Sequence, residues 1–368
     1  MTHRPLRAFL SVGALVLAFS TSTFEMKTAG QQVDGAQSGG WNENDEKYSD
    51  FSGFAPQLLT ALIPDPGGLP TWAIYAPTVR LYWSEQFFPT RASFFIDHSE
   101  LRFSRHEADD ISVAALGNVV ASRLGEASAG DAYFQDGFYA FEKTRPYELN
   151  RSPGLRERDG FFLDLGGAFD TTNERQLWRG CTNGPRCRPD LNNVPVYYEY
   201  AGPDKYIVYW FFYAYSDGWR DFNHEGDWES IVVKLANDSP THVAFNRHGC
   251  TAIVQWRNVR KTDGTGRLNP DGTHPLVYSA RGSHASYAFG RPAVRRVCGA
   301  PFGHDIIGAR WYWRTWRTMR NVLNEPWYGF GGAWGEVGSE DLPRELSSVT
   351  TGPLGPSRYK NVVPEAWR

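Results

Sequence analysis

The sequence has almost no excess of charge of either sign. Among 368 residues, 38 Lys and Arg stand against 41 Asp and Glu, which gives a formal net charge of −3. A protein that binds nucleic acid by neutralising phosphates needs a marked basic excess, so we expect no nucleic-acid partner. The sequence also lacks a Walker loop, a dinucleotide-binding glycine fingerprint, a His-Glu-x-x-His zinc motif and the kinase signatures. None of the corresponding enzyme classes is indicated.

Long hydrophobic runs are absent beyond the N-terminal segment. No later stretch reaches the roughly 18 apolar residues of a membrane-spanning helix, so no transmembrane segment is expected in the mature chain. At the N-terminus, Arg4 and Arg7 precede an apolar run over residues 8–19 that ends in small residues. This pattern predicts a secretory signal peptide over residues 1–20, with a buried N-terminal helix as the alternative. Its removal would leave a net charge of −5 on a protein that is secreted or in the cell envelope.

Aromatic residues, by contrast, are abundant. They make up 15 % of the chain, including 14 Trp, and hydrophobic residues make up 41 %, which excludes disorder over most of the length. Trp, Tyr and Phe are enriched in strands and bury large areas. We therefore predict a mainly β protein with an antiparallel β-sandwich core, long loops and a few short helices. It would form one domain over residues 55–368, after a flexible leader over residues 21–54.

Hydrophobic periodicity places the elements of this fold. The strongest predicted strand, residues 206–215, is apolar on both faces, as in the central strand of a sandwich. Further strands are predicted at residues 75–83, 92–103, 228–235, 241–246 and 275–280, and helices at residues 58–63 and 111–124. Residues 311–320 fit either a strand or a helix. Two Gly-rich segments, residues 329–335 and 352–356, are expected to wrap the core.

Cysteine is scarce, with four residues, and an even count in an exported chain suggests two disulfides. Cys181 and Cys187 frame a short segment with a Gly-Pro turn, whereas Cys250 and Cys298 lie far apart in the sequence. We predict the pairs Cys181–Cys187 and Cys250–Cys298, which is one of three possible pairings. A structural zinc site is the alternative, although the spacing differs from that of paired Cys-x-x-Cys motifs.

The densest group of ionisable residues follows the strongest predicted strand. A second strand beginning near Asp227 would direct Asp227 and Glu229 to one face and Trp228 to the other. His224 in the preceding loop could fold over that face, and Asp217 could approach across the hairpin. Clustered carboxylates repel unless a cation or protons compensate them, and this ligand set suits Mg²⁺, Ca²⁺ or Mn²⁺. The sequence thus predicts a divalent-cation site, with a solvated acidic loop as the alternative.

A second cluster follows a later predicted strand, where the chain reads Arg281-Gly282-Ser283-His284. Ser283 and His284 could act as nucleophile and base, or His284 could bind an anion or a metal together with Arg281. His248, after another predicted strand, is a further candidate. Adjacent side chains point apart and no Gly-x-Ser-x-Gly elbow surrounds Ser283, which disfavours a serine nucleophile. A structural role for His284, in holding the loop backbone, stays open. No catalytic residue is assigned.

Several short segments occur in a characteristic order. They are residues 76–81 followed by Glu85 and Pro89, residues 209–213, residues 224–229, residues 274–287, and Trp334-Gly335 with Gly352-Pro353-Leu354-Gly355-Pro356. Together they resemble the vacuolar protein sorting-associated protein 62 family, which includes plant domains of unknown function. The resemblance extends over about residues 72–368. It implies no assigned biochemical activity.

A narrower region carries an Asp, then a His-x-x-Asp-x-Glu pattern and a later His-Gly, on Asp217, His224, Asp227, Glu229 and His248-Gly249. This region resembles the metal-binding heptapeptide of the necrosis- and ethylene-inducing-like secreted cytolysins. Those proteins are β-sandwiches that bind a divalent cation and target sphingolipid head groups, so the resemblance implies the same cation ligands here. Glu225 and Gly226 depart from the family pattern, which has a basic residue and a second histidine at these positions.

Aromatic residues near these clusters extend the interpretation. Trp219, Trp311 and Trp313 could sit at a membrane interface or stack on sugars, whereas Trp210 and Trp228 are expected in the core. We therefore expect a secreted β-sandwich protein that binds a lipid or glycan head group through a divalent cation at a membrane or cell surface. The alternatives are a metal-dependent hydrolase with His284 or Glu225 as general base, and a structural cell-envelope protein without catalysis.

Overall fold

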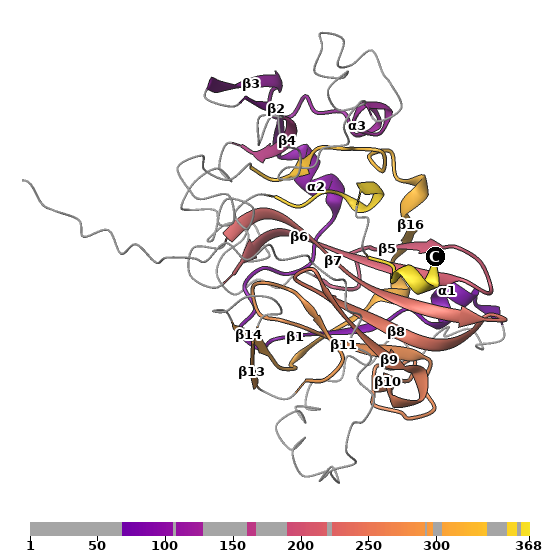
Figure 1. The fold of residues 1–368 in the computed structure, drawn as a ribbon. Coiled ribbons are helices and arrows are strands. Elements are labelled where there is room, and N and C mark those ends of the chain that lie inside the picture. The colour runs from indigo at the N-terminus through magenta and orange to yellow at the C-terminus, as the bar shows by residue number, and fades with distance from the viewer. Residues whose placement is uncertain are drawn as a thin grey trace, which may run out of the picture.

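The computed structural model describes residues 68–105, 108–127, 160–166, 190–218, 223–290, 293–296, 304–336, 352–358 and 362–368. These residues form mostly strands and a few short helices, and the strands make layered sheets (Figure 1). The predicted mainly β fold with sandwich-like sheets is confirmed. The predicted signal peptide at residues 1–20, the leader at residues 21–54 and the helix at residues 58–63 lie outside the described residues. The predicted domain boundaries stay a prediction.

The central sheet has the strand order β16-β5-β6-β7-β8-β9. Its strands are β5 (Val196–Tyr200), β6 (Tyr206–Asp217), β7 (Asn223–Ala236), β8 (Ser239–Arg247), β9 (Cys250–Gln255) and β16 (Met319–Asn321). Neighbours are antiparallel except β16, which runs parallel to β5. The strands predicted at residues 206–215, 228–235 and 241–246 are therefore confirmed as β6, β7 and β8.

Strand β6 is apolar on both faces because another layer covers each face. Tyr209 and Phe211 pack into a core below the sheet, whereas Trp210 and Phe212 pack into a core above it. Successive side chains of a strand point to opposite faces. A strand between two layers is buried on both faces, so none of its positions requires a polar side chain. The unbroken aromatic run of the sequence is the direct consequence.

The lower sheet lies below the central sheet in Figure 1 and has the order β10-β11-β1-β15, with β12 paired to β11. Its strands are β1 (Thr78–Leu81), β10 (Lys261–Thr262), β11 (His274–Ser279), β12 (Ser286–Tyr287) and β15 (Trp311–Arg314). Strand β1 runs parallel to β11 and antiparallel to β15. Val79, Val277 and Trp313 close the lower core against the central sheet. A separate pair is formed by β13 (Ala293–Arg296) and β14 (His304–Ile307).

The upper layer in Figure 1 is the sheet β17-β4-β2-β3 with two helices. Its elements are α2 (Ala92–Asp97), β2 (Ser99–Arg105), β3 (Ala108–Ala114), α3 (Ala121–Ala127), β4 (Gly160–Leu165) and β17 (Ala333–Trp334). The upper core is aromatic: the Trp228 ring centroid lies 4.6 Å from that of Phe212 and 5.3 Å from that of Trp334. Trp210 and Trp228 are buried, as predicted.

Two segments of this layer differ from the sequence expectation. Residues 92–103, predicted as one extended segment, form helix α2 and then strand β2. Ala92, Phe95 and Ile96 are buried together at the i, i+3, i+4 spacing of a helix, and this spacing identifies the short helix. Residues 111–124, predicted as a helix, begin in β3, and the helix α3 starts only at residue 121. Gly117 separates the two in a left-handed turn at φ +78°.

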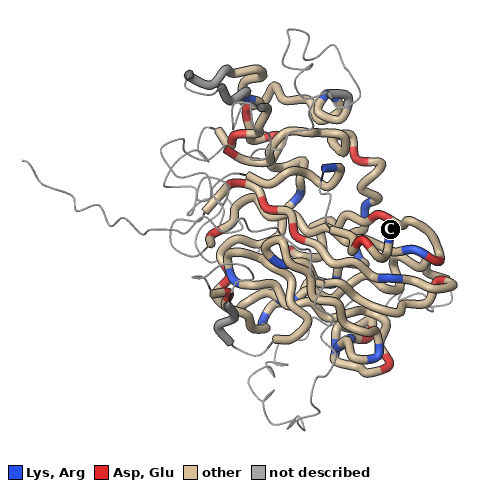
Figure 2. The backbone as a smooth tube through the Cα atoms, in the orientation of Figure 1, with Lys and Arg blue, Asp and Glu red and all other residues tan. Residues whose placement is uncertain are grey.

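The remaining elements are short. Residues 311–320 combine β15, the 3₁₀ helix η6 (Thr315–Arg317) and the start of β16, so neither a single strand nor a single helix describes them. Other short helices are α1 (Thr71–Ile74), η5 (Trp256–Asn258), η7 (Val322–Asn324), η8 (Pro356–Arg358) and η9 (Glu365–Trp367). No helix among the described residues is both long and apolar enough to cross a membrane. Figure 2 shows acidic and basic residues interspersed along the described backbone.

Candidate functional site

The site is centred on His284, in the turn between β11 and β12. Its backbone has a φ of +55°, and its ring is buried and stacked on the Tyr213 ring of β6 at a centroid distance of 3.7 Å. Nδ1 donates to the Asp227 carboxylate at 2.8 Å, and Nε2 donates to the carbonyl oxygen of Phe87 at 2.9 Å. Burial alone would lower the pKa of His284, but hydrogen bonds and charge from Asp227 and Glu85 raise it to about 9. The ring is therefore an imidazolium held between two acids.

Glu85 is the second acid beside this ring. Its Oε1 lies 3.8 Å from Nε2 of His284 and accepts hydrogen bonds from the backbone N–H groups of Gln86 and Phe87. Its Oε2 accepts from the N–H of Gly282 at 3.0 Å. Burial would raise the pKa of Glu85, yet His284 and these N–H groups hold it below its ordinary value. Glu85 therefore joins the segment after β1 to the turn after β11.

A second group of polar residues converges on Asp305 in β14. Ser283 Oγ donates to Oδ1 at 2.6 Å, while Tyr287 OH and Nε2 of His248 donate to Oδ2 at 2.6 and 2.8 Å. Burial would raise the pKa of Asp305, but His248 and the two hydroxyls lower it. His248 lies in the β8–β9 turn with a side chain that is 28 % exposed. Burial would lower its pKa, but Asp305 raises it.

Glu229 on β7 links the two groups. Its pKa lies well above the ordinary value because the side chain loses solvation and because Asp227 and Asp305 repel its negative charge. The Ser230 N–H is a hydrogen-bond donor to this carboxyl group. We call Glu85, Asp227, Glu229, His248, His284 and Asp305 the acid–histidine cluster. It contains four acids and two histidines brought together from five separate segments of the chain.

Of the four predicted cation ligands, two face the acid–histidine cluster and two make other contacts. Asp227 and Glu229 share the face of β7 that holds the cluster, as predicted, and Trp228 points to the upper core. Strand β7 already begins at Asn223, so His224 lies in the strand and its Nδ1 is bonded to the Gly226 carbonyl oxygen at 2.7 Å. Asp217 is paired with Asn223 at the end of β6. No three His, Cys, Asp or Glu in the described residues are arranged to hold a metal ion. The cation site therefore stays a prediction.

The fold separates the residues of the second predicted cluster, which are His248, Arg281, Ser283 and His284. Ser283 and His248 meet at Asp305, whereas His284 turns the other way to Asp227. Arg281 is exposed, and its backbone N–H donates to the Ile306 carbonyl oxygen. Ser283 donates to a carboxylate and not to a histidine, which is not the geometry of an activated nucleophile. The structural interpretation of His284 gains the support of its two buried hydrogen bonds.

Sequence reasoning missed Asp305 and Glu85 as site residues. Asp305 directly precedes Ile306 and Ile307 in β14, and an acid beside an apolar pair is a pattern that the sequence shows. The structure shows that this acid is buried. Glu85 was named only as part of the family resemblance. Its role depends on pairing between β1 and β11, which are almost two hundred residues apart and whose contact no local pattern indicates.

The prediction that Trp313 lies on the surface is wrong. Trp313 is fully buried in the lower core and Trp311 is half-buried, while Trp219 lies outside the described residues. Trp313 lies between the exposed Tyr312 and the half-buried Arg314 of β15 and is directed at Phe211, so its ring faces the core. Trp83, just after β1, is 59 % exposed and was not predicted as a surface residue.

One cysteine is described. Cys250 at the start of β9 is disulfide-bonded. Cys181, Cys187 and Cys298 lie outside the described residues, so the pairing Cys181–Cys187 and Cys250–Cys298 stays a prediction.

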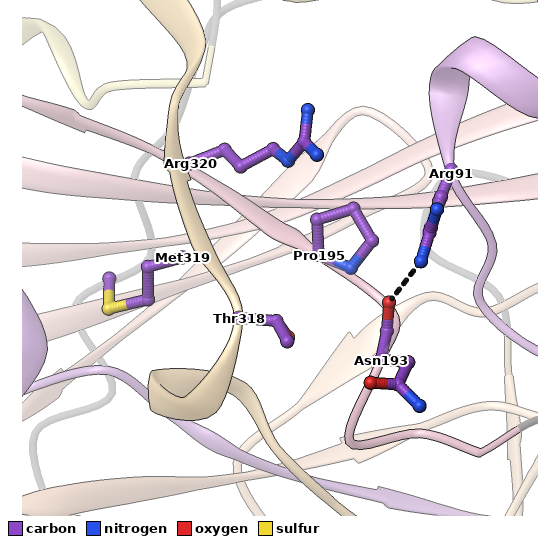
Figure 3. A pocket seen from close by; sticks show the side chains of 6 residues that line it. All are labelled: Arg91, Asn193, Pro195, Thr318, Met319 and Arg320. Atoms are coloured by element: carbon purple, nitrogen blue, oxygen red, sulfur yellow. Dashed lines mark hydrogen bonds between the residues drawn. The ribbon is translucent and has the colours of Figure 1, made fainter.

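A hollow of about 210 Å³ lies elsewhere, beside the β5–β16 pair. Its lining is Arg91, Asn193, Pro195, Thr318, Met319 and Arg320. Figure 3 shows Arg91 directed at Asn193, whose carbonyl oxygen accepts its hydrogen bond at 3.3 Å. The other arginine, Arg320, lies 3.5 Å from the Glu325 carboxylate. The hollow shares no residue with the acid–histidine cluster.

Comparison with known proteins supports one of the two resemblances. No family model matches the chain, and no solved structure matches it. Over 238 residues it is 32 % identical to vacuolar protein sorting-associated protein 62 of Saccharomyces cerevisiae, covering 60 % of this chain and 46 % of that protein. Over 255 residues it is 22 % identical to the putative vacuolar protein sorting-associated protein TDA6 of the same yeast, covering 61 % and 47 %. The chain thus spans about half the length of the curated relatives it matches. The resemblance to the cytolysins stays a prediction.

Proposed function

We propose that this protein is a secreted, non-catalytic binding protein of vacuolar-sorting type, which recognises a lipid or glycan head group through a divalent cation at the acid–histidine cluster. Its curated relatives are named for association with vacuolar protein sorting. The N-terminal signal pattern supports export. Of the four predicted ligands, Asp227 and Glu229 are the pair on which the proposal rests, and Asp217 and His224 stay predicted ligands.

One observation carries the proposal. The Glu229 carboxyl lies against Asp227 and Asp305, and their repulsion helps to raise its pKa far above the ordinary range. Such a group must be compensated by a proton or by a cation. Asp305 already accepts three hydrogen bonds and Asp227 accepts one from His284, whereas the half-buried Glu229 is acted on by the charges of these two acids. A Ca²⁺, Mg²⁺ or Mn²⁺ ion at Glu229 would displace the proton and keep sites for water and for a phosphate or sugar oxygen.

A second candidate function is a hydrolase, favoured by the His248–Asp305 pair. A partly exposed histidine oriented by a buried carboxylate is the usual form of a general base. The bases expected from the sequence are unsuitable: both His284 nitrogens are engaged, and the Glu225 carboxylate accepts from the N–H groups of Leu165 and Glu336. Hydrolysis would therefore depend on His248.

The first test is thermal unfolding of the purified protein with Ca²⁺, Mg²⁺, Mn²⁺ or chelator. A ligand that binds only the folded state at one hundred times its Kd stabilises it by about 2.7 kcal/mol. We expect at least one cation to raise Tm and Glu229→Gln to abolish that rise, because the amide keeps the shape and loses the charge. Glu199→Gln, a half-buried glutamate of β5, is the matched control and should respond as the unsubstituted protein does.

The second test separates binding from catalysis. Saturable, cation-dependent binding to sphingolipid vesicles or to glycans, without turnover of phosphoesters and glycosides, is the result expected of a binding protein. Turnover that is lost in His248→Gln would establish the hydrolase instead. If no cation changes Tm and Glu229→Gln does not differ from Glu199→Gln, the cluster only holds strands together and the structural alternative is correct.

A further inference from the structure

The outer face of the lower sheet carries an arginine that the acid–histidine cluster does not use. Arg80 lies in the middle of β1, between Val79 and Leu81, whose side chains enter the lower core. Because side chains alternate along a strand, Arg80 points to the opposite, outer face. Its cross-strand neighbours are Tyr278 on β11 and Tyr312 on β15, so one tyrosine flanks it on each side. Strands β1 and β11 lie side by side in Figure 1.

Arg80 is buried, and no acidic residue of the described ranges pairs with it. Only 7 % of the residue is exposed, and its guanidinium carbon lies 4.5 Å from the Tyr312 ring centroid and 5.9 Å from that of Tyr278. Its Nε–H has no hydrogen-bond acceptor, and no ion pair joins Arg80 to any Asp or Glu of the described residues. The ring faces attract the positive charge, but they do not supply an oxygen acceptor for the buried Nε–H group.

A guanidinium in this position is energetically unusual. Removing a charge from water is costly unless it is paired and hydrogen-bonded, and buried charges in proteins normally have a partner. A tyrosine pair compensates only part of this cost, since a ring face attracts the charge without accepting the in-plane N–H hydrogen bonds of the guanidinium. A buried arginine with no acid beside it in the described part of the chain therefore points to a counter-ion from outside that part.

Two further arginines lie on the same face. Arg314 is paired with Thr78, so it is a diagonal neighbour of Arg80, and diagonal pairs are within reach of long side chains. The Nε–H of Arg314 is also buried without an acceptor. Arg260 donates from Nη1 to the hydroxyl of Tyr278 at 2.9 Å, which holds a third positive charge beside the same ring. Three guanidinium groups thus lie on this face, and Asp263 lies near that of Arg314.

The site is open on one side and fixed on the other. Tyr312 is 38 % exposed, so an ion can approach Arg80 along its ring from solvent. Tyr278 is held in place, because Gly290 packs directly on its ring and a Cβ there would lie 1.9 Å from the ring carbons. The arginine is therefore pre-positioned before any ligand binds, which reduces the entropic cost of binding.

We propose that Arg80, between Tyr278 and Tyr312, is the centre of an anion-binding site for a phosphate group. A guanidinium binds phosphate through two parallel N–H···O bonds, and the neighbouring arginines add charge. The phosphate belongs either to a lipid head group or to a soluble phosphorylated compound, and both present the same oxygens. This site is on the outer face of the lower sheet and does not depend on the proposed cation site.

The experiment measures thermal unfolding against inorganic phosphate at constant ionic strength, with EDTA present so that no divalent cation contributes. We expect Tm to rise with phosphate and to reach a plateau. In Arg80→Met this rise should disappear, while Tm without phosphate stays the same or increases, because the substitution removes an unpaired buried charge. Arg80→Lys keeps the charge without the planar fork and should bind phosphate at least about tenfold more weakly. Arg257→Met, at an exposed arginine of η5, is the control.

A parallel arm uses phosphatidylcholine vesicles with and without phosphatidic acid, again in EDTA. Binding to phosphatidic acid that Arg80→Met abolishes identifies the lipid as the source, whereas a response to inorganic phosphate alone identifies a soluble compound. The proposal is overturned if phosphate does not raise Tm, or if Arg80→Met and Arg257→Met respond equally. A fall in Tm of Arg80→Met without phosphate, together with an unchanged phosphate response, would show that Arg80 serves only to pack the two tyrosines.

Discussion

His284 and His274 are both buried, yet their surroundings shift their pKa values in opposite directions. His284 lies between Asp227 and Glu85, whose charges outweigh the loss of solvation and raise its pKa to about 9. His274 at the start of β11 is stacked on the Trp316 ring at 3.6 Å, and burial lowers its pKa to about 4. The first is therefore a structural cation and the second a neutral ring.

The hydrogen bond of His274 shows which tautomer it adopts. Its Nδ1 lies 2.7 Å from the carbonyl oxygen of Ala76, which can only accept, so Nδ1 carries the proton of the neutral ring. A second proton would have to enter at Nε2 inside a buried site, where the loss of solvation outweighs the attraction of Asp263. Protonation of His274 therefore destabilises the folded state of the lower sheet.

His274 predicts a specific loss of stability in mild acid. Its pKa is about 4 in the folded chain and about 6.5 in the unfolded chain, so between these values the unfolded state binds more protons. The free energy of unfolding should fall by about 3 kcal/mol as the pH decreases from 6.5 to 4, and the loss ends below pH 4. Urea unfolding across this range, compared between the unsubstituted protein and His274→Gln, checks the prediction. An equally steep pH dependence in His274→Gln would show that other groups cause the loss.

At the scale of single residues, the sequence identified part of the site. Asp227 and Glu229 were found because an Asp-x-Glu pair at the start of a strand shares one face by geometry. His224 was misplaced because the hairpin is longer than its polar residues suggested, and β7 reaches back to Asn223. Asp305 and Glu85 become neighbours of the site only through sheet pairing, which single-sequence patterns do not specify.

At the scale of elements, β7 is distinguished by the glycine in its acidic stretch. Gly226 has a φ of +59°, and a Cβ there would lie 2.0 Å from the Trp334 carbonyl oxygen of β17. The left-handed residue also separates the acids on either side: Glu225 reaches the upper layer at Leu165, whereas Asp227 reaches His284 below. One glycine thus lets β7 contact both layers at the same point.

Substituting this glycine should be more damaging than substituting a glycine of similar backbone. Gly249 has a φ of +78° and nothing within 4 Å of its Cβ position, so Gly249→Ala should cost only left-handed strain, about 1 kcal/mol. Gly226→Ala adds a clash with backbone that cannot rotate away, and we expect a loss above about 3 kcal/mol. Urea unfolding of both variants measures the difference. Similar losses would mean that β17 moves aside freely and that this contact does not hold the layers together.

The same elements show which strands were predictable. Strands β6, β7 and β8 of the central sheet were found because each contains an apolar stretch that is bounded by turn residues, whereas β5 and β9 were not predicted. Helix α2 was missed because it is six residues long and its Phe-Phe-Ile run suits a strand equally well until its partners are known. The parallel pairs β1–β11, β16–β5 and β17–β4 were not expected, since they join segments that lie far apart in the sequence.

At the scale of the whole molecule, one sheet serves two cores. Phe95 of α2 packs in the upper core against Phe212, and Phe245 of β8 packs in the lower core with Phe211. Phe211 and Phe212 are adjacent residues of β6, so the two cores are separated by a single layer of backbone. The strand cannot lose one core and keep an intact arrangement on its other face.

This arrangement predicts that the described layers unfold in one cooperative transition. Phe95→Leu and Phe245→Leu each remove volume from one fully buried side chain, and each should lower the free energy of unfolding by about 1 to 2 kcal/mol with an unchanged urea m-value. Hydrogen exchange should report equal losses of protection in β2 and β11 for either variant, because both sheets depend on β6. Two separate transitions, with Phe95→Leu affecting only β2 and Phe245→Leu only β11, would show instead that the layers fold independently and that sharing one central strand does not couple the cores.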